Sequence, residues 1–361
     1  MPEYNPSTPT HFNYIYELVK LLSRELDIFL VIEKGIKPDF LSGEKYYVQK
    51  LQFLPLRILE NFFVVFYARM RGYSDFYIHY SFLSAFNASF VTKFLKGRTF
   101  YWNCGLPWQY PRNFLRKLLE QLIYQMITLL VTGTENLKIK YANHYRIPLN
   151  KIRVMPNWID LGSVKRQVSS ARINELKYRL NIAQDTRVVL FVHRLSRRKG
   201  AHYLAEIVNK IRDEKAVTVI IGDGPEKEDL EFKIRALGLK DRARFLGWVS
   251  NQDALNYFAI ADVFIMPSEE EGFPHVLLES MAMGIPFVAS RVGGVQDITP
   301  EAAHRYLVTI GDTLQFADKI HELLHKDSEE LRVIKNLLVN WVKRYDILNS
   351  VKNFKELILH N

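Results

Sequence analysis

Residues 265–294 read IMPSEEEGFPHVLLESMAMGIPFVASRVGG, and they hold two carboxylates, Glu271 and Glu279, eight positions apart. The pattern predicts a loop that ends near Phe273 and a helix that starts near Pro274. A helix N-terminus between two acids offers backbone N–H groups and the positive end of the helix dipole to an anion. This geometry suits a sugar nucleotide, with the ribose on Glu279 and the hexose on Glu271. The alternative is an ordinary strand, loop and amphipathic helix whose acids are solvated.

A second segment supplies positive charge. Residues 187–200 read RVVLFVHRLSRRKG, in which Val188 to Val192 form an apolar run typical of a buried strand. The strand would deliver Arg194 and Lys199 to one loop. Two cations in such a loop are suited to binding a diphosphate and to offsetting the negative charge on a leaving nucleotide. A simple solvated basic loop is the alternative.

Together these segments resemble the donor site of the retaining glycosyltransferases of family 4, the glycosyl transferases group 1, which have the GT-B fold. The family pattern is Glu, seven residues, Glu, starting as EGFG, and its strand before the cationic loop ends in GRLSxxKG. Here Pro274 replaces the last glycine of EGFG, and His193 replaces the glycine before Arg194. Proline is tolerated in the first turn of a helix, so the first departure is mild.

Two further segments resemble the same family. Residues 217–231 contain a GDG turn after an apolar strand, and residues 243–268 contain FLGW, whose loop lies against the nucleotide base in the family. Trp248 could instead be a packed aromatic. The resemblance implies three catalytic residues, namely Arg194, Lys199 and Glu271. It implies donor binding by Gly222, Gly224, Gly247, Trp248, Val249, Gly272, Phe273, Pro274, His275, Val276, Leu277 and Glu279, with Gly272 to Leu277 offering backbone N–H groups.

The first half of the chain reads as alternating strands and helices, which predicts a parallel α/β domain. The expected helices are 11–26, 53–71, 111–127 and 135–146, and the expected strands are 28–32, 75–80, 98–104, 128–134 and 151–157. The resemblance then implies two Rossmann-like parallel-sheet domains that face each other across a cleft. Residues 1–157 would form the acceptor-side domain and residues 158–339 the donor domain, with a polar linker at about 161–171. A helix at about 340–361 would pack back on the first domain.

The beginning of the chain departs from the family. Family members start with a strand and a glycine-rich loop, whereas this sequence starts with MPEYNPSTPTH, as if just after that strand. The loop Pro6–Thr10 lacks the paired glycines that allow close approach of backbone to phosphate. Either the true start lies upstream, or the first strand of the N-terminal sheet is missing, and a missing strand would leave unpaired sheet edges.

The acceptor side of the site is poorly defined. Many family members have a His–Gly pair near the reacting sugar, where residues 102–108 of this chain read WNCGLPW and offer Cys104 and Gly105. His79, at the end of the strand DFYIHY, is a substitute candidate. The alternatives are a small buried thiol at Cys104 and a satisfied core histidine at His79.

Charge is distributed unevenly along the chain. The net charge is +10, and residues 1–157 hold 20 basic and 11 acidic residues against 29 and 28 in residues 158–361. A basic acceptor domain favours an anionic partner, such as a lipid diphosphate, an acidic polysaccharide or a membrane surface. The helix 111–127 is amphipathic and basic, which suits docking on a membrane or, alternatively, packing on the sheet. The sequence has no recognised nucleic-acid motif.

Composition narrows the class of protein. The sequence has 48% hydrophobic residues but no apolar run of the roughly 18 residues that a membrane span needs. Its single cysteine excludes an internal disulfide and fits a reducing compartment. We therefore expect a cytoplasmic protein, at most peripheral to the membrane. We expect no cofactor and no metal, because neither a zinc-like Cys/His cluster nor an acidic DxD-like pair stands out.

The resulting hypothesis is a retaining, metal-independent hexosyltransferase that moves a sugar from a nucleotide-diphosphate sugar to an acceptor hydroxyl. A role in synthesis of a cell-surface polysaccharide or glycolipid would follow from the resemblance. One alternative is a sugar-nucleotide epimerase on the same fold. The other is a catalytically impaired protein that binds a sugar nucleotide or a glycan.

Overall fold

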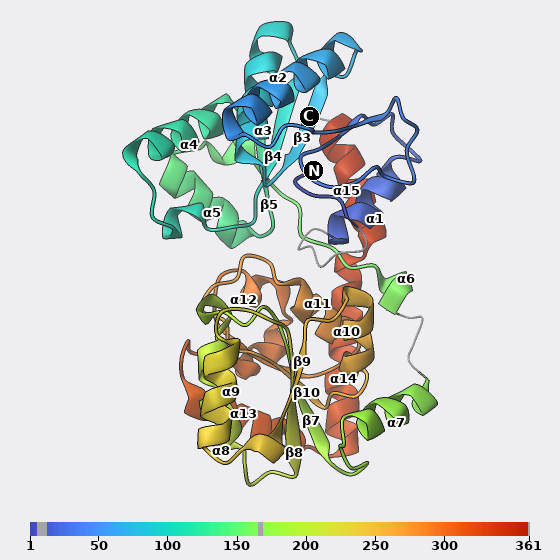
Figure 1. Ribbon diagram of the computed structural model, residues 1–361, viewed down its shortest axis with the longest axis vertical. Coiled ribbons are helices and arrows are strands. Elements are labelled where there is room, and N and C mark those ends of the chain that lie inside the picture. Colours follow the sequence, from blue (N-terminus) through green and yellow to red (C-terminus); the bar gives the residue numbers. More distant parts are fainter. Residues whose placement is uncertain (6–12, 165–168, 360–361) are drawn as a thin grey trace. The chain divides into compact units, whose positions relative to one another are not determined.

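The computed structural model describes residues 1–5, 13–164 and 169–359 (Figure 1). The chain divides into two compact units. The first unit combines Met1–Asn157 with Leu348–Asn361, and the second is the continuous stretch Trp158–Ile347.

The second unit is built on a six-stranded, fully parallel sheet with strand order β12-β11-β10-β7-β8-β9. Parallel strands covered by helices on both faces are continuously apolar, which explains runs such as VVLFV and VTVII in the sequence. The strands are β7 (Arg187–Val192), β8 (Ala216–Ile221), β9 (Ala243–Gly247), β10 (Val263–Met266), β11 (Phe287–Ser290) and β12 (Leu307–Val308).

Helices cover both faces of this sheet, with α8, α9 and α13 on one side and α10, α11 and α14 on the other (Figure 1). The helices of the unit are α6 (Leu161–Val164), α7 (Ser170–Arg179), α8 (Leu204–Lys210), α9 (Lys227–Ala236), α10 (Asn251–Phe258), α11 (His275–Ala282), α12 (Val295–Ile298), α13 (Thr313–Leu324) and α14 (Ser328–Val342). The predicted linker 161–171 contains α6 and the start of α7, while its residues 165–168 lie outside the described part of the chain.

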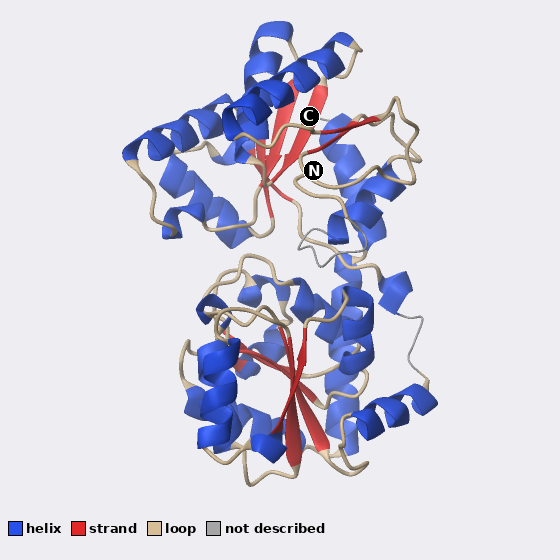
Figure 2. Cartoon of the chain, viewed as in Figure 1, coloured by secondary structure: helices blue, strands red, loops and turns tan. Residues whose placement is uncertain are grey.

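The first unit contains two parallel sheets, one with order β3-β4-β5-β6 and one of β1 and β2 (Figure 2). The strands are β1 (Leu30–Ile32), β2 (Tyr46–Val48), β3 (Asp75–His79), β4 (Arg98–Trp102), β5 (Leu129–Thr132) and β6 (Ile152–Val154). The helices are α1 (Asn13–Leu22), α2 (Leu54–Met70), α3 (Phe82–Leu95), α4 (Phe114–Met126) and α5 (Glu135–Tyr145).

The start of the chain lies beside β1. The Met1 ammonium group donates to the Val31 carbonyl at 2.7 Å, and the Tyr4 N–H donates to the Lys34 carbonyl at 2.9 Å. Tyr4 also forms a single parallel bridge with Gly35. The Glu33 N–H donates to the Met1 carbonyl at 3.0 Å and the Ile36 N–H to the Tyr4 carbonyl at 2.9 Å, so the start of the chain runs parallel to the segment that begins with β1. Among the described residues no strand joins the β1–β2 sheet to the β3–β6 sheet. The predicted glycine-free loop Pro6–Thr10 lies outside the described residues.

Two elements of the first unit, β2 and α3, were not predicted. Helix α3 reads FLSAFNASFVTKFL and has no clear helical hydrophobic stripe. Small residues, including Ala85 and Ala88, form its buried side, whereas Phe90 and Phe94 are exposed. The usual rule that large apolar residues mark the buried face therefore fails for this helix.

The C-terminal run divides between the two units. Helix α15 (Ile347–Leu359) packs on the first unit, where the Phe354 ring lies 4.5 Å from that of Tyr77. The preceding residues stay with the second unit, because the Trp341 indole N–H donates to the Ile298 carbonyl at 2.8 Å. The boundary is therefore at Ile347, later in the chain than the predicted residue 339.

Candidate active site

The candidate donor residues gather at the carboxyl ends of the strands in the second unit. Strand β7 leads into the loop with Arg194 and Lys199, and its neighbour β10 leads into the loop with Glu271. Ligands of open parallel sheets bind outside the carboxyl ends of the strands. The two halves of the predicted donor motif are thus brought to one edge of the sheet.

Glu271 is the centre of a hydrogen-bonded cluster. Its Oε2 lies 2.7 Å from Nζ of Lys199, and its Oε1 accepts from the Ser268 hydroxyl at 2.7 Å. Nε2 of His193 lies 3.3 Å from the same Oε1. His193 Nδ1 accepts from the Arg194 N–H at 2.9 Å, so the ring hydrogen is on Nε2 and points to the carboxylate. Sequence patterns did not reveal this role of His193.

Electrostatics keep Glu271 ionised and His193 neutral. Burial by itself would raise the pKa of Glu271, but the charge of Lys199 and the hydrogen bond from His193 outweigh it and hold the pKa far below its ordinary value. Burial, together with the charge of Lys199, lowers the pKa of His193. The cluster is therefore a fixed ion pair with a neutral donor beside it, and its charges are set before any ligand binds.

Two glycines allow the loops of this edge to touch. A Cβ atom on Gly293, where φ is +52°, would lie 1.5 Å from the carbonyl oxygen of Glu271. A Cβ atom on Gly222, where φ is +136°, would lie 1.9 Å from the carbonyl oxygen of His193. Backbone therefore packs directly on backbone behind the cluster, which fixes Glu271 and His193 in place.

Helix α11 begins beside the cluster, as the sequence predicted. Pro274 is its N-cap residue, and the first-turn N–H groups of His275, Val276 and Leu277 have no acceptor within the helix. The side chains around this terminus are fixed: the Phe273 ring packs on Tyr345 at 5.6 Å. This N-terminus has the geometry of an anion site.

The His275 ring does not serve as a charged group at this site. Burial lowers its pKa to about 3, and its ring hydrogen-bonds to the backbone of Trp158. The imidazole is therefore neutral near pH 7. What His275 offers to an anion is its backbone N–H.

Glu279 lies one turn further along α11. Burial raises the pKa of Glu279 to about 7. The carboxyl group is thus poised between its protonated and ionised forms near neutral pH. A ribose with two vicinal hydroxyls would donate to the ionised form, which fits the predicted role.

A family comparison agrees with this geometry. The model of the glycosyl transferases group 1 matches residues 172–337, which include every catalytic and donor-binding candidate. Residues 172–337 are a glycosyl transferases group 1 domain.

Curated relatives match the chain over somewhat more than half of its length. The chain is 30% identical to N-acetyl-alpha-D-glucosaminyl L-malate synthase of Bacillus anthracis over 200 residues, which are 55% of this chain and 51% of that protein. It is 28% identical to the UDP-Gal:alpha-D-GlcNAc-diphosphoundecaprenol alpha-1,3-galactosyltransferase of Escherichia coli over 215 residues, 58% of this chain and 54% of the relative. The chain thus spans about half the length of these relatives.

A solved structure extends the likeness to both units. The Anabaena protein Alr3699/HepE in complex with UDP and glucose has a TM-score of 0.80 at 19% identity, and covers 98% of this chain and 97% of its own. At this level of identity the comparison concerns the fold alone. It confirms the predicted GT-B fold of two parallel-sheet domains.

The group 1 domain leaves two donor candidates open to solvent. The Arg194 side chain is exposed and forms no ion pair with the residues that the structure describes. Trp248 follows Gly247 at the end of β9 and is 50% exposed, so it is not a packed core aromatic.

The adjacent Val249 is half-buried, and the Gly247 carbonyl accepts from the Gly222 N–H at 2.7 Å. The GDG turn, which includes Gly224, and the FLGW loop therefore lie side by side.

The weak acceptor-side candidates lie in the core of the first unit. His79 is buried, stacks on Trp102 at 3.8 Å and contacts the Tyr14 hydroxyl at 3.0 Å. Cys104 is also buried, and burial raises the pKa of its thiol well above the ordinary value. Gly105 is held by a hydrogen bond from its N–H to Asn103 Oδ1 at 2.8 Å. The structure favours the packing interpretation for His79 and Cys104.

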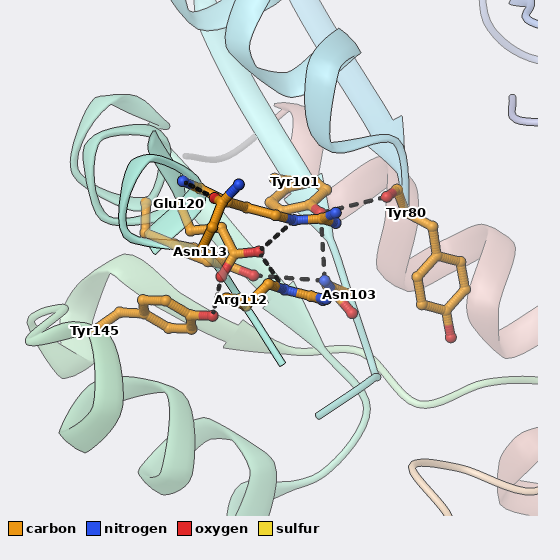
Figure 3. Close-up of polar contacts among 9 residues, drawn as sticks. Tyr80, Tyr101, Asn103, Arg112, Asn113, Glu120 and Tyr145 are labelled. Carbon is orange, nitrogen blue, oxygen red and sulfur yellow. Dashed lines mark hydrogen bonds and ion pairs between the residues drawn. The ribbon is translucent and has the colours of Figure 1, made fainter. Parts of the chain in front are cut away.

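The sequence did not predict a buried ionic cluster that is centred on Glu120 of α4. Glu120 accepts from Arg112 Nε at 3.0 Å, from Arg116 Nε at 3.3 Å and from the Tyr145 hydroxyl at 3.2 Å (Figure 3). Asn113 caps the helix by accepting from the Arg116 N–H. Two arginines face one carboxylate here, so the cluster carries excess positive charge.

The first unit has a pocket near this cluster. Its volume is about 460 Å³, and its walls come from α2, α3 and α4. Glu33 follows β1, Gln49 follows β2 and Ser81 follows β3, so the pocket opens at the carboxyl ends of the strands. Most of its remaining lining is apolar, with Arg57 and Arg116 at the polar side.

Proposed function

We propose that this protein transfers a glycosyl group from a nucleotide-diphosphate sugar to an acceptor hydroxyl, with retention of configuration and without a catalytic metal. The observation that carries the proposal is the Lys199–Glu271 pair beside the N-terminus of α11. A cation, the first-turn N–H groups of a helix and two glutamates at one sheet edge match the parts of a nucleotide sugar. The Anabaena neighbour, whose complex holds UDP and glucose, supports UDP as the nucleotide to test first.

Each group has a role in the proposed reaction. Arg194 and the N–H groups of α11 bind the diphosphate and stabilise the charge that develops on it. Lys199 holds Glu271 in position to accept from the hexose hydroxyls. Glu279 accepts from the ribose hydroxyls.

The proposed bond changes occur on one face of the sugar. The acceptor oxygen forms a bond to the anomeric carbon while the bond from that carbon to the diphosphate oxygen breaks. The acceptor proton passes to the departing phosphate oxygen. No protein nucleophile is needed, and the configuration is retained.

We also propose a lipid-linked, anionic acceptor presented at a membrane surface. The exposed side of α2 supports this, because a stripe of large apolar residues follows its whole length. Phe63, at 64%, is typical of their exposure. The stripe consists of Leu56, Leu59, Phe63, Phe66, Tyr67 and Met70. Contiguous exposed apolar patches mark interaction or membrane surfaces.

Helix α4 continues the apolar surface around the pocket. Of its predicted apolar face, Ile123 and Ile127 are buried, whereas Leu115 is 74% exposed, together with Phe114, Leu118 and Leu122. An acyl or isoprenoid chain could pass from this surface into the pocket, with its phosphate near Arg57. Arg57 forms no ion pair with any described residue.

Charge in the same part of the chain favours anionic lipid. Residues 50–126 hold ten basic and three acidic residues. All three acids are engaged internally: Glu60 with the Tyr47 hydroxyl, Asp75 with Arg98 and Glu120 with Arg112. Arg98, Arg112 and Arg116 pair with two of these acids, and the other seven basic residues leave the segment with a net positive charge, which suits a negative bilayer surface. None of the described helices is long and apolar enough to cross a membrane.

The donor half of the proposal is tested with purified protein. A thermal-shift screen of UDP-, GDP- and ADP-sugars identifies the base, and NMR of the product reports the anomeric configuration. Transfer with an inverted anomer would refute retention. Conversion of the donor without any acceptor would indicate an epimerase, and binding without turnover would indicate a sugar-nucleotide binding protein.

The membrane half is tested by sedimentation with vesicles. We expect binding to phosphatidylglycerol vesicles but weak binding to phosphatidylcholine vesicles, with loss at high salt. Phe63→Glu and Leu115→Glu should each reduce binding, whereas Tyr178→Glu, at a highly exposed position of the second unit, should not. Equal binding to both vesicle types, or no effect of either variant, would contradict the proposal.

A further inference from the structure

Three potential metal ligands meet on the surface of the second unit. His321 and His325 lie four residues apart on the last turn and C-cap of α13, and Glu214 lies between α8 and β8. One ligand atom from each residue lies within 4.8 Å of the other two. Glu214 comes 107 residues before His321 in the chain, so the cluster exists only in the folded protein. Sequence spacing alone did not predict this cluster, because Glu214 is distant from the two histidines in the chain.

The distances are close to those of a tetrahedral metal site. Glu214 Oε1 lies 2.5 Å from His321 Nδ1, and Glu214 Oε2 lies 3.7 Å from His325 Nε2. Ligand atoms on one Zn²⁺ ion, with bonds of about 2.0–2.2 Å, are about 3.3 Å apart. To hold one ion, the Glu214–His321 distance must therefore lengthen and the Glu214–His325 distance must shorten, each by less than about 1 Å. Both imidazoles are more than half exposed, so solvent leaves room for a shift of this size.

The tautomer of His325 is already suited to a metal. Its Nδ1 lies 3.0 Å from the carbonyl oxygen of His321, which can only accept a hydrogen bond. The hydrogen of the neutral ring is therefore on Nδ1, and Nε2 has its lone pair directed toward Glu214. A hydrogen bond from the second ring nitrogen to a backbone carbonyl is the usual support of a metal-bound histidine.

The dipole of α13 also favours a cation at the cluster. The carbonyl end of α13 carries the negative end of the helix dipole. The nearest lysines of the same segment are engaged elsewhere, Lys319 with Glu322 at 2.9 Å and Lys326 with Glu330 at 2.8 Å. The Glu214 backbone is held by a hydrogen bond from Arg242 to its carbonyl at 2.8 Å.

We propose that Glu214, His321 and His325 form a surface site for Zn²⁺ or a similar divalent transition-metal ion, with water completing the coordination. Two imidazoles and one carboxylate are ligands that Zn²⁺, Ni²⁺ and Cu²⁺ accept. The site joins the end of α13 to the segment before β8. That is the amino end of the strands, whereas Lys199 and Glu271 lie at the carboxyl ends. The ion would therefore stabilise the fold of the unit and take no part in glycosyl transfer.

The test is a Zn²⁺ titration of the full chain without a polyhistidine tag. We expect one equivalent to bind, with a rise in Tm that EDTA reverses. His321→Ala and His325→Ala should each weaken binding at least tenfold, and His304→Ala, which alters a histidine outside the cluster, should not. Thermal melts in EDTA would show that the variants are folded.

The outcomes separate this site from the proposed reaction. EDTA should lower Tm without changing nucleotide-sugar binding or turnover. The site is refuted if Zn²⁺ does not bind at 100-fold excess, or if it binds equally well to the His321→Ala/His325→Ala double variant. Loss of turnover in EDTA would instead contradict the metal-independent mechanism and leave the site in place.

Discussion

The Nζ atom of Lys199 lies 2.7 Å from Oε2 of Glu271, although 72 residues separate them in the chain. Their side chains are 11% and 4% exposed, so the pair is almost wholly removed from water. The two residues that we assigned to different parts of a donor sugar thus form one unit. A substitution at either position will disturb both.

Removing Lys199 should therefore affect stability as well as activity. In Lys199→Met the Glu271 carboxylate loses its charge partner, and leaving a buried charge unpaired costs on the order of 3 kcal/mol. We expect a lower free energy of unfolding in urea and a strong loss of turnover. The double variant Lys199→Met/Glu271→Gln should regain part of the stability and none of the activity. Additive losses in the double variant would contradict the coupling.

Arg194 should affect activity alone. Its side chain is exposed and unpaired among the described residues, so Arg194→Ala should leave Tm unchanged. Loss of one charge that stabilises the leaving diphosphate should reduce kcat by roughly 100-fold or more. Arg197→Ala, at an exposed position of the same loop, is the matched control. Similar kcat values in the two variants would remove Arg194 from the proposed mechanism.

The acid stability of the protein should depend on Glu271. Its pKa is depressed in the folded protein relative to an ordinary value of 4.5. The stability that this carboxylate provides is therefore complete above about pH 4.5 and declines as the pH falls below it. Urea unfolding between pH 6 and pH 3 should show a steeper loss for the wild type than for Glu271→Gln. Parallel curves for the two proteins would mean that Glu271 is not ionised by its neighbours.

Donor binding should weaken as the pH falls through neutrality. The pKa of Glu279 is raised to about 7, so below that pH the group is protonated and accepts less well from ribose hydroxyls. We expect the Kd of a UDP-sugar to rise by up to about tenfold per pH unit below 7. Glu279→Gln should bind weakly, with little dependence on pH. A wild type whose Kd is constant from pH 8 to pH 5.5 would argue against ribose binding.

The close approach at Gly293 predicts a large effect from one added carbon. Gly293→Ala would place Cβ 1.5 Å from the Glu271 carbonyl oxygen at a positive φ, so the loop must move. We expect a destabilisation of more than about 1 kcal/mol and weaker donor binding. Gly43→Ala has open space around the new carbon and should be nearly silent in both measurements.

The donor site could be predicted because its signals are local. Glu271, Glu279 and the start of α11 near Pro274 lie within one short segment, and strand β7 is marked by its apolar run. The contact of His193 with Glu271 could not be predicted, because it depends on the pairing of β7 with β10. The same holds for Glu214 with His321.

The first unit was harder to predict because its helices break the usual pattern. Helix α3 buries small residues and exposes Phe90 and Phe94, and α4 exposes Leu115 while burying Ile123. A hydrophobic stripe indicates one apolar face, but it does not say whether protein or lipid covers that face. The boundaries of α2 and of the strands β3 and β4 came within a few residues of the prediction, since these follow ordinary periodicity.

Trp248 provides a way to observe the donor site directly. Trp102 and Trp158 are fully buried, whereas half of the Trp248 side chain faces solvent beside the Gly222 turn. A nucleotide base stacked on this indole would quench its emission, against a background from the buried Trp102 and Trp158 and the half-buried Trp108 and Trp341. The protein therefore contains its own fluorescent reporter, and donor affinity can be measured by titration without any label.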